Sequence, residues 1–117
     1  MSRLARVLLI GSRTDRCLDP LTLDVYLDET RCISQKFPTT GWWGKLRPGD
    51  DLLPFVFFPK GKLDFGSGFD EEDRFAEINI QNKRLDVGEY VTMTDSEGEH
   101  CFAVKQVLWV DELAIAV

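Results

Sequence analysis

His100 and Cys101 are the only neighbouring base and nucleophile in the chain, and a cysteine hydrolase would need such a pair. Adjacent residues on a strand point to opposite faces, however, so these two side chains cannot readily share a proton. The chain has no second histidine. Carboxylates such as Asp24 and Glu77 are abundant, but none has a sequence context that marks it for proton transfer. The sequence therefore predicts a protein that is not an enzyme and has no catalytic residues.

The cysteines Cys17, Cys32 and Cys101 could join His100 as four ligands of a structural zinc ion. Their spacing contains no paired knuckle, and no Cys-x-x-Cys occurs. The acidic run 70–73 also lacks the alternating oxygen ligands of a calcium loop. We therefore expect neither metal nor cofactor, and we interpret the cysteines as reduced, mostly buried thiols in a reducing compartment.

Two adjacent tryptophans, Trp42 and Trp43, lie among glycines in an irregular part of the chain. Tryptophan buries a large area at low entropic cost and is enriched at binding hot spots. It also stacks on sugars and bases. The alternative is structural, with one or both rings closing the open end of a barrel.

A second aromatic motif is Phe65-Gly66-Ser67-Gly68-Phe69, which is followed at once by four acids at 70–73. Its glycines match no phosphate-binding fingerprint. Two apolar anchors beside a block of negative charge suit docking on a basic protein surface, whereas the structural alternative has both phenylalanines packed back onto the core. The candidate partner-binding residues from both motifs are Trp42, Trp43, Phe65, Phe69, Asp70, Glu71 and Asp73.

Composition fits one β-rich domain over residues 1–117, since 44% of the residues are hydrophobic and 29% are charged. The net charge of -6, from 14 basic and 20 acidic residues, disfavours a phosphate-backbone binder. The first sixteen residues are nevertheless basic. No run approaches the length of a membrane span, so we expect a cytoplasmic protein with no membrane partner.

Hydrophobic periodicity indicates strands that position these motifs. Residues 4–10 form an apolar run that fits a central strand, buried on both faces toward its end. Residues 21–28 and 74–80 alternate with period two. Residues 52–58 are strongly apolar, and Pro54 places this strand at an edge or makes it begin after the proline.

The last third of the chain, residues 83–110, predicts one long β-hairpin. Asp95 and Gly98 are the residues that a tight turn prefers at its first and fourth positions. The apolar tail 113–117 should form a final strand or dock on the core. Segments 30–49 and 59–73 are expected to be long loops, with a short strand around 31–34 and a helical turn beginning near Asp70.

These elements predict an all-β fold, a small antiparallel barrel or sandwich of six to seven strands with little helix. The hairpin pattern around Leu85, Val87, Gly88 and Val91 resembles SH3-like, OB-like and translation-factor-like barrels in general character. This pattern is generic to tight barrels and identifies no family.

We hypothesise that the chain is a small acidic protein-binding module, such as an inhibitor, immunity or adaptor protein. One alternative is a nucleic-acid-binding barrel that uses Trp42 or Trp43 with the basic residues Arg3, Arg6, Arg13, Arg16, Lys45 and Arg47. Another is a structural subunit that associates through the edges at 52–58 and 113–117.

Overall fold

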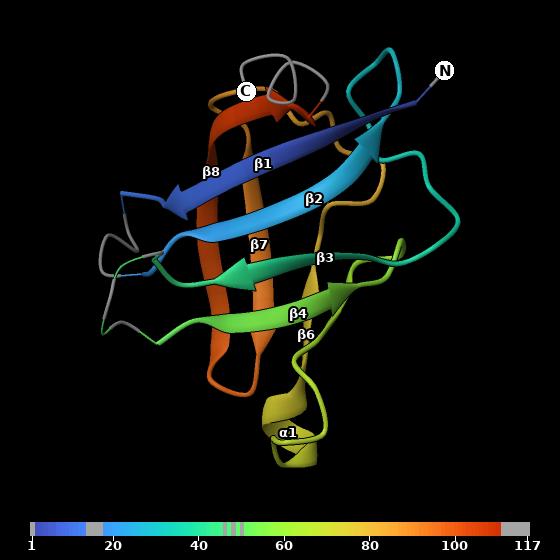
Figure 1. The fold of residues 1–117 in the computed structure, drawn as a ribbon. Helices are drawn as coiled ribbons and strands as arrows, with labels where there is room; N and C mark the ends of the chain where they lie inside the picture. The colour runs from blue at the N-terminus through green and yellow to red at the C-terminus, as the bar shows by residue number, and fades with distance from the viewer. Residues whose placement is uncertain (1, 14–17, 46, 48, 50, 111–117) are drawn as a thin grey trace.

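The computed structural model describes residues 2–13, 18–45, 47, 49 and 51–110, and these residues form a closed antiparallel β-barrel (Figure 1). Each strand pairs with the next one along the chain, and the last strand pairs with the first. The strands are β1 (Arg3–Gly11), β2 (Leu21–Leu27), β3 (Thr39–Trp43), β4 (Leu53–Phe57), β5 (Lys62–Asp64), β6 (Phe75–Ile78), β7 (Tyr90–Asp95) and β8 (Gly98–Trp109). One helical turn, α1 (Glu71–Arg74), precedes β6.

The expected all-β class is confirmed, and the structure resolves the choice between barrel and sandwich in favour of a barrel. The described residues form eight strands instead of six or seven. The strands that we did not expect, β3 and β5, lie inside segments interpreted as long loops. β3 carries Gly41 at its centre and β5 has three residues, so neither shows a readable alternating pattern. The strand expected near residues 31–34 is only an isolated bridge between Leu27 and Ile33.

Alternate residues of each strand fill the barrel interior, as the period-two pattern requires. Ala5, Val7 and Leu9 of β1 are fully buried. Burial of β1 on both faces, which we expected toward its end, is wrong, because Ile10 is 38% exposed. The remaining interior positions include Leu21, Leu23, Val25, Leu27, Phe55, Phe57, Leu63, Ala76, Ile78, Val91, Met93, Phe102 and Val104.

β4 accommodates Pro54 because the first half of this strand has a neighbour on one side only. Pro54 lies opposite Trp42 of β3, whereas β5 pairs with β4 only at Val56 and Phe57. The strand therefore begins before the proline, and the expected edge is restricted to its first half.

The long hairpin is confirmed as β7 and β8, which pair from Tyr90–Ala103 down to Asp95–Gly98. Gly98 has a φ of 117°, which glycine adopts without a steric penalty. The Asp95 Oδ1 accepts a hydrogen bond of 2.9 Å from the backbone N–H of Glu97 and so holds the turn. The tail 113–117 lies outside the described residues.

The sequential strand order places the connections alternately at two ends of the barrel. At the end called here the α1 end, β1 meets β2, β3 meets β4, β5 meets β6 through α1, and β7 meets β8. The connections β2–β3, β4–β5 and β6–β7 lie at the opposite end. In the described ranges, no helix has the length and apolar character of a membrane span.

Gly41→Ala should destabilise the barrel by about 1–3 kcal/mol, the usual cost of overpacking a core. A Cβ at Gly41 would lie 2.2 Å from the carbonyl oxygen of Thr22 and 2.7 Å from the ring of Phe55. Denaturant unfolding of the purified variant measures the loss.

Gly68→Ala is the matched control, since its Cβ would meet no atom within 4 Å. It should leave the free energy of unfolding unchanged within a few tenths of a kcal/mol. Equal stability of the two variants would contradict the close approach at Gly41.

Candidate functional site

Aromatic rings gather at the α1 end of the barrel. The ring centroids of Phe65 lie 5.5 Å from Phe55, 6.2 Å from Phe69 and 6.4 Å from Trp43. The Trp43 ring is also 6.0 Å from the imidazole of His100. Trp43 and Phe65 pack against the buried core, whereas Phe69 is 39% exposed. The cluster thus covers the core at this end and presents one ring to solvent.

The barrel register fixes Trp43 in this cluster. Trp43 lies opposite Leu21 of β2 and Leu53 of β4. Its indole Nε1 donates a 2.9 Å hydrogen bond to the backbone carbonyl of Asp19. Because the polar atom of the indole has a partner, the ring can close the end of the core without an unsatisfied donor.

The Asp64 carboxylate holds the loop that carries Phe65 and Phe69. It accepts bonds of 2.9 and 3.1 Å from the Arg74 guanidinium, and a third of 2.9 Å from the backbone N–H of Gly66. These donors lower the pKa of Asp64, with the Arg74 hydrogen bond as the largest cause. The same bond raises the pKa of Arg74. This two-point clamp ties the end of β5 to the end of α1.

A cavity of about 320 Å³ opens beside these rings. Among the described residues, its charged lining consists of the carboxylates of Asp73, Asp95 and Glu97, with no lysine or arginine. The Ser96 hydroxyl donates to Asp73 Oδ1 at 2.7 Å, and His100 Nε2 lies 2.9 Å from Asp95 Oδ1. The remaining lining residues are Trp43, Leu53, Phe65, Phe69 and Ser96. We call this the acidic cavity.

The structure brings together four of the seven candidate residues, since Trp43, Phe65, Phe69 and Asp73 all line the acidic cavity. Asp70 and Glu71 do not line it, but they are exposed at the start of α1, where a helical turn was expected. Trp42 lies apart from this set.

Trp42 belongs to β3, so the interpretation of both tryptophans as loop residues is wrong. Neighbours on a strand face opposite sides, and Trp42 therefore points away from the core that Trp43 covers. The Arg6 guanidinium lies 5.0 Å from the Trp42 ring centroid. Arg6 also bonds Asp24 at 2.8 and 2.9 Å, which raises the pKa of Arg6.

These contacts weaken the proposed arginine track for nucleic acid, because the charge of Arg6 is neutralised by Asp24. Arg3 lies 4.4 Å from the Trp109 ring. Arg13, Lys45 and Arg47 are exposed, and Arg16 lies outside the described residues. None of them is among the described residues that line the three cavities of about 830, 550 and 320 Å³.

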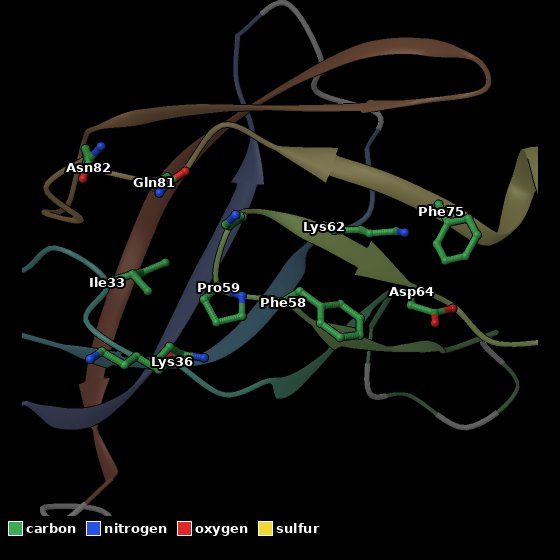
Figure 2. A pocket seen from close by; sticks show the side chains of 11 residues that line it. Ile33, Lys36, Phe58, Pro59, Lys62, Asp64, Phe75, Gln81 and Asn82 are labelled. Carbon is green, nitrogen blue, oxygen red and sulfur yellow. The ribbon is translucent and has the colours of Figure 1, made fainter.

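A larger concave surface of about 830 Å³, which sequence reasoning missed, involves the opposite end of the barrel (Figure 2). We call it the lysine groove. Lys60 and Lys62 lie close together in the sequence. The other lining residues come from distant segments of the chain, and only the barrel fold brings them together. Its lining residues are Ile33, Gln35, Lys36, Phe58, Pro59, Lys60, Lys62, Asp64, Phe75, Gln81 and Asn82.

The histidine and the cysteines that the sequence offered for catalysis or metal binding do not form a site in the described residues. His100 lies opposite Met93 and Cys101 opposite Thr92 on adjacent positions of β8. The His100 side chain is only 14% exposed. Cys32 and Cys101 are half-buried thiols, and Cys17 lies outside the described residues. Within the described ranges, no group of three or more His, Cys, Asp or Glu side chains could hold a metal ion.

Comparison of the chain with protein-family models, with curated proteins and with solved structures found no match.

Asp64→Asn should destabilise the protein at neutral pH, and the difference from wild type should vanish in acid. A lowered pKa in the folded state means that the Asp64 carboxylate stabilises the fold above its unfolded-state pKa of about 3.9. This contribution is lost as the pH falls through the lower folded-state pKa. Denaturant unfolding from about pH 7 to pH 2 measures both proteins.

Glu89→Gln is the control, since Glu89 is exposed and has no ion pair within the described ranges. Its free energy of unfolding should equal that of the wild type at every pH measured. A difference between Asp64→Asn and wild type that persists at the lowest pH would show that the clamp does not depend on the ionised carboxylate.

Proposed function

We propose that the protein is a non-enzymatic binding module whose α1 end docks a basic segment of a partner protein. The observation that carries this proposal is the acidic cavity, in which aromatic rings and three carboxylates share a lining that has no basic residue in the described part of the chain. In this proposal the cavity receives one lysine or arginine side chain of the partner.

The charge around the cavity supports a cationic ligand. Asp70, Glu71 and Glu72 are exposed beside the lining residue Asp73. The one arginine of α1, Arg74, is bound to Asp64 and so offsets little of this charge. A concentration of one sign of charge raises the association rate of an oppositely charged partner and suppresses binding of like-charged ones.

Besides the carboxylates, the aromatic rings of the acidic cavity favour a cation. A guanidinium or ammonium over an aromatic face gains roughly 0.5–2 kcal/mol from the ring quadrupole. Phe69 is accessible to such a group, since it is 39% exposed, and Trp43 lines the same cavity. The methylene stem of lysine or arginine would pack on these rings while its head meets Asp73 or Glu97.

The size of the cavity suits one side chain. At about 320 Å³ it is at the lower end of pockets that hold whole small molecules, which start at roughly 300 Å³. An acidic module that accepts one basic anchor and surrounds it with carboxylates could cover a basic functional surface. An inhibitor, immunity or adaptor protein of the cytoplasm would act in this way.

Titration calorimetry with an arginine-rich octapeptide tests the proposal. Phe69→Ala should weaken binding by about 2 kcal/mol, the scale of an interface hot spot. Asp73→Asn should also weaken it, because the amide keeps an oxygen for the Ser96 hydroxyl but loses the charge.

Glu89→Gln removes one negative charge at the opposite end and serves as the control for bulk electrostatics. It should change the affinity by less than about twofold. Unchanged binding by folded Phe69→Ala and Asp73→Asn, or an equal loss in Glu89→Gln, would refute the acidic cavity as the docking site.

A further inference from the structure

The lysine groove is lined by residues from all three connections at the end opposite α1 and by residues on the strands β5 and β6. Ile33 and Lys36 come from the β2–β3 connection, and Pro59 and Lys60 come from the β4–β5 turn. Gln81 and Asn82 come from the β6–β7 connection. The groove continues over Lys62, Asp64 and Phe75 on β5 and β6. Four separate parts of the chain thus meet at one concave surface.

Among the described residues, the groove lining carries three lysines and one carboxylate. Lys36, Lys60 and Lys62 are exposed and have no ion pair within the described ranges. The one carboxylate in the lining, Asp64, is bound to the Arg74 guanidinium at two points. An anion in the groove would therefore meet three available ammonium groups in a protein whose net charge is -6.

The lysines are spread along the groove. In Figure 2, Lys36 lies beside Ile33 on one side of Pro59, and Lys62 extends on the other side toward Phe75. The Lys62 Nζ is 4.0 Å from the centre of the Phe75 ring. Charges separated in this way match successive phosphates of an extended chain better than one compact anion.

Apolar and amide groups accompany the charges. Phe58, 37% exposed, lies with Pro59 between Lys36 and Phe75 and presents a ring on which a base could stack. Gln81 and Asn82 are exposed in the same lining, and their amides offer both donors and acceptors. Lysines beside an exposed aromatic ring are the combination that single-stranded nucleic-acid sites use, the lysines for the phosphates and the ring for a base.

We propose that the lysine groove binds a short stretch of single-stranded nucleic acid. The phosphates contact Lys36, Lys60 and Lys62, one base stacks on Phe58, and base edges meet Gln81 and Asn82. A volume of about 830 Å³ admits only a few nucleotides. The acidic cavity lies among the connections of the α1 end, so this site is separate from the one proposed for a basic partner.

Fluorescence anisotropy with labelled single-stranded octamers of RNA and DNA tests this inference. Log affinity should fall with log salt with a slope of about −2, since each neutralised phosphate of a single strand contributes roughly −0.7. Lys60→Gln should reduce that slope by about 0.7 and weaken binding roughly five- to tenfold at about 50 mM salt. Phe58→Ala should weaken binding by about tenfold at every salt concentration, because the stacking of a base on the ring does not depend on charge.

Lys105→Gln makes the same charge change at an exposed lysine of β8 outside the groove, and it should bind as wild type does. Asp73→Asn should not weaken oligonucleotide binding, which separates this site from the acidic cavity. A tenfold preference between the RNA and DNA octamers would identify the natural strand, and equal binding would still support the groove.

Several outcomes would overturn the inference. These are no binding at about 50 mM salt, an affinity independent of salt, equal losses in Lys60→Gln and Lys105→Gln, and tighter binding of an oligoglutamate octapeptide than of either octamer. Thermal unfolding of each variant confirms that a lost affinity reflects the groove and not the fold.

Discussion

The pairing of β8 with β1 is the constraint on which the rest of the structure depends. β8 is twelve residues long, and it pairs with β7 over residues 98–103 and with β1 over residues 102–109. This pairing closes the sheet into a barrel and encloses the alternate apolar residues of every strand. A shift between Leu8 and Leu9 adjusts the register of this seam. Without the closure, Val7, Leu9, Phe102 and Val104 would lose their common interior.

Closure also decides which loops become neighbours. In an antiparallel barrel of sequential strands, alternate connections share an end, so residues far apart in the chain lie together there. Trp43, Phe65 and Asp95 meet at the α1 end for this reason, and Lys36, Lys60 and Gln81 meet around the lysine groove. The Asp64–Arg74 clamp then fixes the Phe65–Phe69 loop against the core. The strand order thus brings the residues of each candidate site together, and at the α1 end the hydrogen bonds of Asp64 hold the loop in place.

From composition, the net charge of -6 disfavours a binder of phosphate backbones. The structure shows that the acidic and basic side chains are unevenly distributed between the two sites. Acids collect around the acidic cavity and on α1, whereas the lysine groove has three lysines and one neutralised carboxylate. Under the two proposals, the acidic cavity would attract a cationic ligand and the lysine groove an anionic one, each over the short range that salt screening allows. A single chain of this size can in this way present one face to a basic partner and another to a polyanion.

The sequence by itself determined the all-β class, the β7–β8 hairpin and the interior positions of β2 and β6, because period-two alternation and turn residues are local signals. It also marked two short aromatic motifs, the second with acids beside it, as candidate binding sites: Trp42, Trp43, Phe65, Phe69, Asp70, Glu71 and Asp73. Only the tertiary structure decided barrel closure, the short strands β3 and β5, the outward position of Trp42 and the assembly of the lysine groove. These features depend on which strands pair over long sequence separations, and no local pattern encodes that choice.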